Sequence, residues 1–405
     1  MPLEPIPASA APSQAFPLPS RAAGLARLAE FLPRAGQDYA ETRNYDLGPD
    51  AHQNVSGLSA YLRHRLLTEE EVVGAVLARH GPDAAEKFVQ EVLWRTYWKG
   101  WLEQRPTLWT DWQAACAGLA TSGLDLAAAE QGRTGINCFD HWARELVETG
   151  YLHNHARMWF ASLWIFTLRL PWQLGAAFFL RHLLDGDPAS NTLSWRWVAG
   201  LHTPGKTYLA TPDNIATFTK GRFQPGSITH GPAPDFTPHP PVQALPEIDS
   251  APNAPALLLM TQDDLHAESL DLARGQVAAI AALPVLEEGI SKKVYDFRAA
   301  ALAEGCARAA AHFGAPILSV VNSDLLAAAA QLRVRHIVTA YAPTGPVAAR
   351  LAALRQICAA AGVRLHLLQR PWDSRAWPLA TKGFFAFRQH IPMLIGHLDK
   401  GDGGA

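Results

Sequence analysis

Apolar residues recur at helical spacing through the first half of the chain and gather into short runs in the second half. In the first half, this spacing predicts helices at 21–32, from 60 onward, at 86–101, from about 153 and at 172–184. In the second half, short apolar runs lie at 257–261, 276–283, 316–321, 336–341 and 363–368. The helical stretches among them lie at 293–313, 323–332 and 345–361. Alternating strands and helices indicate a parallel sheet with helices on its faces.

This change of pattern predicts two domains of different class. An all-helical domain is expected over 21–224, and a Rossmann-like α/β domain with a parallel sheet over 255–405. The stretch 225–254 is rich in Pro and Gly and is interpreted as a linker, and the Pro/Ala/Ser-rich residues 1–20 as an extended arm. No glycine-rich phosphate-binding motif follows a predicted strand, so neither a dinucleotide fingerprint nor a P-loop is expected.

Composition narrows the classes of function. The 405 residues carry a formal net charge of -2, which disfavours a globally basic DNA-coating protein but allows a local basic groove. The N-terminus lacks the pattern of a signal peptide, and charged and polar residues interrupt the apolar runs near 159–180, so we expect buried helices and no membrane span. The cysteines lie far apart without metal-ligand spacing, which predicts no metal site and a reducing, cytoplasmic setting: Cys116, Cys138, Cys306 and Cys358.

The stretch from 151 to 197 combines an apolar sequence with several polar side chains. These are Asn154, Arg157, Asp185, Asp187 and Asn191. Buried polar groups must be paired, because leaving them unpaired in an apolar setting costs free energy. They pair either with each other or with a polar ligand held inside a helical core, and we favour the ligand.

Two further segments carry candidate binding chemistry. Residues 54–59 read NVSGLS and run into a helix, whose first backbone N–H groups can bind an anion such as phosphate; an ordinary helix cap is the alternative. In the helix at 86–101, Glu91, Trp94 and Arg95 share one face and could line a cleft for a planar polar ligand. The alternative there is an ion pair beside a core tryptophan.

Several motifs, in order and at matching separations, resemble those of the photolyase and cryptochrome family. SGLSAYL resembles the family's phosphate-binding TSxLSPYL, and EVLWRTYW resembles ExxWRxFY. RTGINCFDHWAREL is similar to TGxPxxDAxMREL, TGYLHNHARMW to TGxMHNRxRM, and DGDPASNTLSWRW to DxDxAxNxGxWQW. The resemblance covers most of 21–223.

The resemblance implies a helical domain that holds FAD in a U-shape. The FAD phosphates would face four residues of the loop before the second helix: Tyr45, Ser56, Leu58 and Ser59. Arg157 would pair with Asp185 beside the isoalloxazine, and Asp187 would bond its pyrimidine edge. Asn191 would face N5, where it can stabilise the reduced flavin, and Asn154 would approach the adenine or the cavity floor.

The same resemblance implies a cleft for damaged DNA. Glu91 and Arg95 would lie by the cleft, and Trp94 would offer a stacking face for flipped bases. Met158 and Trp197 would border the lesion cavity. Basic residues that could contact DNA phosphates are Arg63, Arg65, Lys99, Arg196, Lys206, Lys220 and Arg222.

For electron transfer, Trp195 and then Trp172 resemble the first two members of the family's tryptophan chain. The usual third position falls near Leu119, and Trp112 or Trp109 could substitute. Other departures from the family pattern are Val55 in place of Thr, Thr192 to Ser194 in place of a segment with glycine, Arg196 in place of Gln, and His155 in place of Arg. These departures weaken the photoreduction route more than they weaken FAD binding.

The second half resembles the family's α/β domain, which normally comes first. LLLMTQDDLH is similar to the opening strand of that domain, and the segment from GCARAAAHFGAP to HIVTAY is similar to its later part. The resemblance therefore predicts a circularly permuted member, with the FAD domain first and the α/β domain last.

The leading functional hypothesis is a lyase that repairs cyclobutane pyrimidine dimers in DNA with blue light and reduced FAD. The alternative is a cryptochrome-like photoreceptor that binds FAD without repair. A flavin-free DNA-binding or interaction module would leave the polar cluster without a purpose. For (6-4) lesions a catalytic histidine is expected, for which His153 and His155 are candidates, whereas Met158 favours the dimer. We expect a monomer, with UV-damaged DNA as partner, and identify no antenna chromophore.

Overall fold

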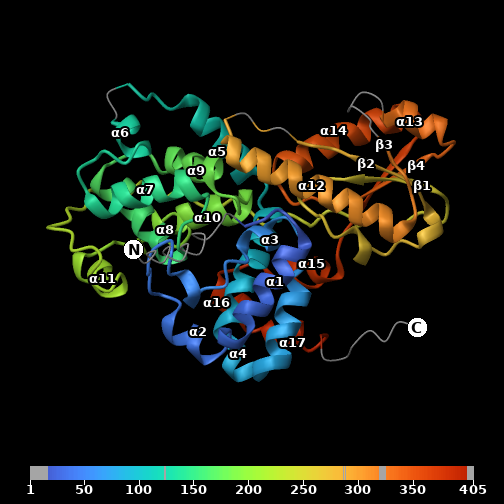
Figure 1. Ribbon diagram of the computed structural model, residues 1–405. Coiled ribbons are helices and arrows are strands. Elements are labelled where there is room, and N and C mark those ends of the chain that lie inside the picture. Colours follow the sequence, from blue (N-terminus) through green and yellow to red (C-terminus); the bar gives the residue numbers. More distant parts are fainter. Residues whose placement is uncertain (1–16, 123–124, 286, 288, 319–324, 399–405) are drawn as a thin grey trace, which may run out of the picture.

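A computed structural model describes residues 17–122, 125–285, 287, 289–318 and 325–398 of the chain. Most of the predicted N-terminal arm and the end of the run at 316–321 lie outside these residues. Figure 1 shows the helical half and the α/β half side by side, with helix α4 extending below both.

The first half of the chain is helical, as the spacing of its apolar residues predicted. Its helices are α1 (Arg21–Phe31), α2 (Gln37–Thr42), α3 (Ser59–Arg63), α4 (Glu69–Glu103), α5 (Thr107–Gly118), α6 (Leu126–Glu130), α7 (Asn137–Thr149), α8 (Asn154–Ser162), α9 (Trp172–His182), α10 (Pro188–Val198) and α11 (Pro212–Phe218). A π-helical turn, η3 (Leu163–Thr167), follows α8. The predicted helix at 86–101 is the second part of the longer α4.

Helix α4 is the long central element of the helical half. It begins at a capping box, in which the Thr68 hydroxyl accepts from the Glu71 N–H while the Glu71 carboxylate accepts from the Thr68 N–H. It bends at Gly81, whose φ of 73° lies in the left-handed region, and at Pro82, which cannot donate to the preceding turn. The bend lets one helix contact both α2 and the C-terminal segment.

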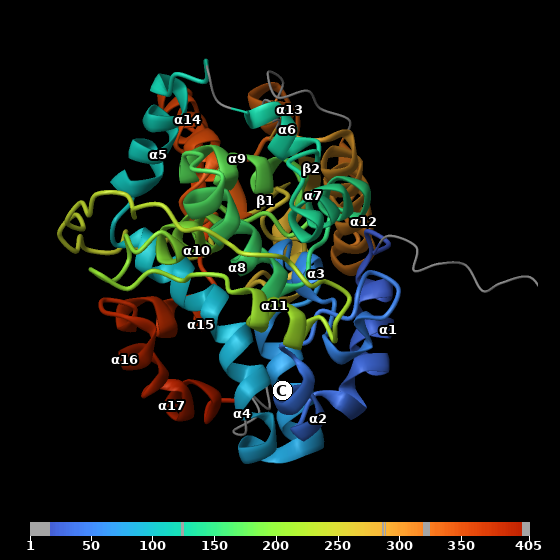
Figure 2. The same cartoon turned by 90° about the vertical axis from the view of Figure 1, so that its left-hand side faces the viewer.

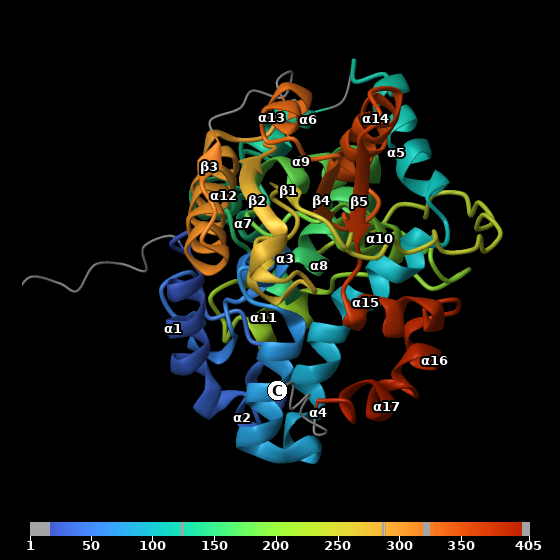
Figure 3. The same ribbon diagram turned by 90° about the vertical axis from the view of Figure 1, so that its right-hand side faces the viewer.

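The second half forms the predicted parallel α/β structure. Five strands pair in parallel in the order β3-β2-β1-β4-β5. They are β1 (Ala256–Met260), β2 (Val277–Ala282), β3 (Ile317–Leu318), β4 (His336–Ala340) and β5 (Arg364–Leu368). Helix α12 (Lys292–Phe313) covers one face, and α13 (Leu325–Gln331) and α14 (Pro346–Ala360) cover the other (Figure 3). Alternate residues of β1 accordingly contribute to two different apolar clusters, because successive strand side chains point to opposite faces.

The two halves are joined by an irregular segment and by a returning C-terminal segment. Residues 223–252 contain neither helix nor strand. After β5, three short helices that the sequence patterns did not predict return to α4: α15 (Pro371–Ala376), α16 (Phe384–Arg388) and α17 (Ile391–Ile395). Figure 2 shows them alongside α4. Gly100 permits this contact, because a Cβ there would lie 2.8 Å from the Cα of Trp377.

Candidate functional site

Two of the polar residues of 151–197, Arg157 and Asp185, meet where α8 faces the loop between α9 and α10. Arg157 on α8 binds Asp185 with both terminal nitrogens, at 3.0 and 3.1 Å, and its Nε donates to the Leu152 carbonyl at 2.8 Å. A bidentate pair of this kind fixes the orientation of the guanidinium group and also balances its charge. The Asp185 carboxyl is buried, which alone would raise its pKa, but Arg157 and Arg95 outweigh burial and lower it.

Asp187 combines a structural role with a charge that faces the neighbouring arginines. One carboxylate oxygen accepts from the Ser190 N–H at 2.7 Å and thereby caps α10. The other lies 3.6 Å from Arg63 Nε and 3.7 Å from Arg95 Nη1. Burial would raise the pKa of Asp187, but Lys99, Arg63 and Arg95 outweigh it and hold the pKa at about 2. Asp187 is therefore ionised at neutral pH and can accept a further hydrogen bond.

Arg95 on α4 lies between the two aspartates. Its terminal nitrogens are 3.6 Å from Asp185 and 3.7 Å from Asp187, longer than hydrogen bonds, and its buried Nη1 has no hydrogen-bond partner among the described residues. An unsatisfied buried donor is costly and marks a place where a ligand acceptor fits. We name Arg95, Arg157, Asp185 and Asp187 the cofactor cluster.

The donor and acceptor set of the cofactor cluster fits a flavin. The pyrimidine edge of a flavin presents an N–H between two carbonyl oxygens, so it needs one anionic acceptor and adjacent donors. Asp187 supplies the acceptor, and Arg95 supplies an unsatisfied donor beside it. Asn191, one turn along α10, instead donates to the Ala176 carbonyl on α9 at 2.9 Å.

The predicted phosphate loop lies before α3. Gly57 has a φ of 64°, in the left-handed region, and Arg27 braces the loop by donating to the Ser56 carbonyl at 2.7 Å. The Ser56 hydroxyl accepts from the Leu58 N–H, and the Ser59 side chain helps to lower the pKa of Asp185 in the cofactor cluster. Other predicted cofactor residues lie apart from this contact: Tyr45 packs on Phe218, and the Asn154 side chain is exposed at the start of α8.

The predicted lesion-contacting residues of α4 are engaged elsewhere. Glu91 pairs with Arg43, which follows α2, at 2.6 Å, and burial raises its pKa more than Arg43 lowers it. Trp94 stacks on Phe384 of α16, with ring centroids 3.6 Å apart and planes 12° apart. One face of the ring expected to stack on bases is therefore covered by the C-terminal segment. Met158 and Trp197 are half-buried, and Trp197 packs near Tyr208.

The tryptophans expected to transfer electrons occupy two settings. Trp195 is buried against Phe179 and Gly175, where a Cβ would lie 2.3 Å from its ring. Trp172 begins α9 and lies nearer the surface. The next residue, Gln173, accepts at its carbonyl from Trp112 Nε1 at 3.3 Å, and Trp112 stacks on Trp109 at 4.9 Å. Both substitute candidates thus lie on the Trp172 side, and Leu119 only ends α5.

Four of the basic residues predicted to contact DNA are buried instead: Arg63, Arg65, Lys99 and Arg196. Arg63 binds Asp263 at 2.9 Å, and Arg65 binds Asp373 at 2.7 Å. Lys99 is buried near these groups, and burial and Arg65 lower its pKa. The prediction was wrong for Arg63 and Arg65 because each pairs with an aspartate of the α/β half, far away in sequence. It was wrong for Lys99 and Arg196 because packing buries their side chains. Lys206 and Lys220 are exposed, and Arg222 binds Asp46 at 3.1 Å.

A second ionic group, which the sequence patterns did not reveal, joins the two halves. Asp264 accepts from Arg370 at 2.6 and 2.7 Å and from Arg65 at 3.4 Å, and Arg65 also binds Glu69 and Asp373. We name these five residues the interdomain cluster. Asp264 has its pKa lowered far below its usual value, since both arginines outweigh its burial.

Other features bear on the classes of function considered above. Within the described ranges, no group of three or more His, Cys, Asp or Glu side chains is arranged to hold a metal ion. No helix in the described part of the chain is long and apolar enough to cross a bilayer. A cavity of about 620 Å³ lies at Trp172, and its walls include none of the cofactor cluster.

Comparison with known proteins agrees with this geometry. A family model described as the FAD binding domain of DNA photolyase matches residues 88–221. The deoxyribodipyrimidine photo-lyase of Streptomyces griseus is 32% identical over 200 residues, which cover 46% of this chain and 44% of the relative. An enzyme of the same name from Thermus thermophilus is 33% identical over 203 residues, 49% and 46% of the two chains. The chain thus matches less than half the length of these relatives.

A solved structure with a weaker likeness is a bacterial class III photolyase from Agrobacterium tumefaciens. It is 28% identical and has a TM-score of 0.43, over 50% of this chain and 43% of the other. A score this low supports no argument about arrangement. The family match covers the second part of α4, helices α5 to α11 and the cofactor cluster. Residues 88–221 are therefore similar to the FAD binding domain of DNA photolyase, and this match supports FAD as the cofactor.

Proposed function

We propose that this protein repairs cyclobutane pyrimidine dimers in DNA with FAD and blue light. The observation that carries the proposal is the cofactor cluster, in which a bidentate Arg157–Asp185 pair lies beside an ionised Asp187 and an unsatisfied Arg95 nitrogen. The relatives named deoxyribodipyrimidine photo-lyase support the substrate class.

We assign the binding of FAD to residues on both sides of the cofactor cluster. The ring system is assigned to Arg95, Arg157, Asp185, Asp187 and Asn191, the phosphates to Tyr45, Ser56, Leu58 and Ser59, and the adenine side to Asn154. Reduced FAD, when bound and excited by blue light, supplies one electron that opens the two cyclobutane bonds of the dimer and then returns, so the reaction is redox-neutral overall.

The residues of the chain itself bind and orient the flavin ring and the flipped bases. Asp187 stays ionised and accepts a hydrogen bond, while Arg95 donates one, which sets the direction of the ring. Burial raises the pKa of Glu91, which favours the protonated carboxyl, and we assign this group a hydrogen bond to a pyrimidine carbonyl. Trp94, Met158 and Trp197 are proposed to receive the flipped bases, since base–aromatic stacking contributes about 1–3 kcal/mol per base.

The order of the two halves enters the proposal separately. The helical domain precedes the parallel α/β domain in this chain. Because the resemblance implies the opposite order in the family, we propose that the chain is circularly permuted. The interdomain cluster then supplies contacts between the halves that do not depend on which half comes first.

One observation favours a second candidate, a photoreceptor that binds FAD without repair. Phe384 covers one face of the Trp94 ring, and Arg43 forms an ion pair with the Glu91 carboxylate. Side chains engaged in this way are less available for base stacking, which favours signalling through a partner.

The decisive experiment uses the full chain, purified in the dark, reduced chemically and illuminated on DNA that carries a single dimer. Chemical reduction bypasses the tryptophan chain. Loss of the dimer in light but not in darkness supports repair. A yellow protein that leaves the dimer intact supports the photoreceptor, and a protein that cannot be reconstituted with FAD overturns both.

A further inference from the structure

A cavity lies beside the side chain of Trp172, and none of the residues of the cofactor cluster line it. It has a volume of about 620 Å³ and lies among α5, the segment from η3 to α9, α10 and residues 232–240 of the irregular segment. Its apolar walls come from Leu108, Trp112, Ile165, Leu170, Trp172 and Leu201. Pockets of this size and character commonly hold small organic molecules.

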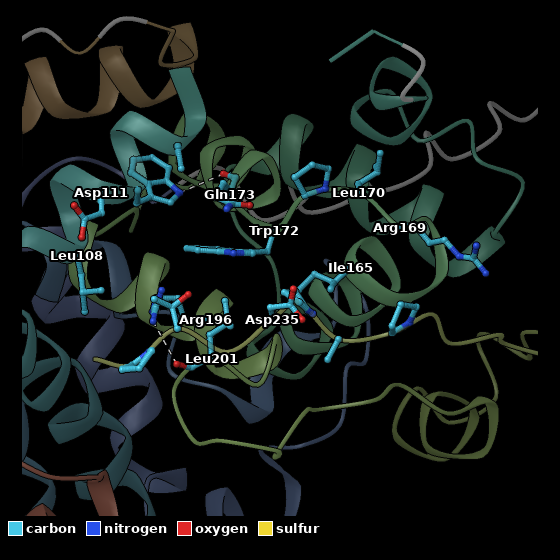
Figure 4. A pocket seen from close by; sticks show the side chains of 18 of the residues that line it. Leu108, Asp111, Ile165, Arg169, Leu170, Trp172, Gln173, Arg196, Leu201 and Asp235 are labelled. Carbon is cyan, nitrogen blue, oxygen red and sulfur yellow. Dashed lines mark hydrogen bonds between the residues drawn. The ribbon is translucent and has the colours of Figure 1, made fainter. Parts of the chain in front are cut away.

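Arg196 supplies the charge inside this cavity. The residue is only 8% exposed, and its Nε is buried without a hydrogen-bond partner among the described residues. Its Nη2 donates to the Leu201 carbonyl at 3.3 Å. Figure 4 shows the Arg196 guanidinium below the Trp172 ring, which is seen edge-on, and the two are 5.8 Å apart. A buried cation with an unused donor is stabilised by an anionic acceptor.

The other charged groups of the cavity lie toward solvent. Asp111 and Asp235 are exposed, and so is Arg169, so water screens all three. Asp111 attracts Arg196, but burial lowers the pKa of Arg196 more than Asp111 raises it, and no ion pair within 4.0 Å joins them among the described residues. The interior of the cavity therefore has one uncompensated charge, and that charge is positive.

We propose that this cavity binds a planar aromatic carboxylate. The ring would lie against Trp172 between the apolar walls, because aromatic rings gain both burial and stacking there. The carboxylate would accept from the guanidinium of Arg196, since planar guanidinium groups suit planar carboxylates. The proposal does not depend on FAD or on DNA repair, since none of these walls belongs to the cofactor cluster.

The test is calorimetric titration of the full chain with 2-naphthoate, and with 2-naphthamide as a neutral ligand of the same shape. We expect saturable binding of the carboxylate and at least about tenfold weaker binding of the amide, as one charge-assisted hydrogen bond is lost. Equal binding of the two, or no binding of the carboxylate up to its solubility, overturns the proposal.

Variants locate the site. R196Q should weaken 2-naphthoate about tenfold or more, whereas R169Q, a matched change at an exposed arginine of the same cavity, should change it less than about threefold. Because R196Q alters a buried charge, A115W provides a second test that fills the cavity from α5 and leaves Arg196 in place. Binding that survives both R196Q and A115W in folded protein places the ligand elsewhere and overturns the assignment.

Discussion

The cofactor cluster and the interdomain cluster use the same chemistry to different ends. Each contains two arginines and at least two buried carboxylates, and some of their members lie on the same helix, α4. In the interdomain cluster every side-chain nitrogen of Arg65 and Arg370 has a partner. In the cofactor cluster Arg95 keeps a buried nitrogen without one among the residues that the structure describes. The difference separates a contact that holds the fold together from a site that is complete only with a ligand.

The largest effect is expected from breaking the interdomain cluster. The substitution Asp264→Ala leaves Arg65 and Arg370 without their shared partner, and removing one member of a buried ion pair costs about 3–5 kcal/mol. Urea unfolding should show this loss in the free energy of unfolding. The exposed pair of Lys292 with Asp296 provides the control, since Asp296→Ala should cost less than about 1 kcal/mol. Similar losses in the two variants would contradict a structural role for the cluster.

The second prediction is that a substitution in the cofactor cluster weakens the binding of FAD. Arg157→Ala removes the bidentate partner of Asp185 and should weaken FAD binding about tenfold to a hundredfold, because the buried Asp185 carboxylate then loses the group that orients it and balances its charge. Bound flavin measured by absorbance, against free FAD in the dialysate, gives the affinity. Arg181→Ala, which breaks the more exposed pair with Glu130, should leave FAD content unchanged. Full FAD content in Arg157→Ala would place the flavin elsewhere.

The lowered pKa of Asp187 predicts that the free energy of unfolding depends on pH. Its pKa is lowered from 3.8 to about 2 on folding, so the ionised form is favoured in the folded protein. This contribution is complete above the unfolded pKa and is lost as the pH falls through the folded one, a difference of about 2 kcal/mol. The stability gap between the wild type and Asp187→Asn should therefore narrow by about 2 kcal/mol between pH 5 and pH 2. A constant gap across this range would mean that folding does not shift the pKa of Asp187, and a gap that widens toward pH 2 would mean that the carboxyl is protonated when folded.

The smallest expected effect concerns the covered face of Trp94. Phe384→Ala uncovers the ring and should strengthen binding of dimer-containing DNA a few-fold, about 1 kcal/mol, if Trp94 stacks on bases. Phe385→Ala is the matched control, because that neighbour is 76% exposed. Fluorescence anisotropy of labelled DNA measures the change. Equal affinity in the two variants would favour the photoreceptor alternative.

Local sequence signals predicted the elements well. Helical spacing placed α1, α3, the second part of α4, α8 and α9, and alternating runs predicted the parallel sheet, because both depend on neighbours a few residues away. The sequence pattern did not predict the short helices α15, α16 and α17, because each has only five or six residues and too few turns to show a periodic pattern.

The candidate site was predicted only in part. The motifs that carry Arg157, Asp185 and Asp187 lie within one stretch, and the structure brings these residues together. In the sequence, the basic residues that are buried look the same as basic residues on a surface: Arg63, Arg65 and Lys99. The sequence pattern around Glu91 and Trp94 likewise does not reveal their partners, Arg43 and Phe384. In each of these residues the partner comes from another element, which spacing along one helix does not reveal.

The sequence by itself determined the order of the two halves and the class of each, because periodicity and local motifs are properties of short segments. Only the tertiary structure decided which charges meet, as Arg65 does with Asp264 and Asp373, 199 and 308 positions away. It also decided that Arg196 lies inside a cavity and not on the surface. The physical reason is that burial and pairing of a charge depend on how whole elements pack, and packing is set by contacts across the entire chain.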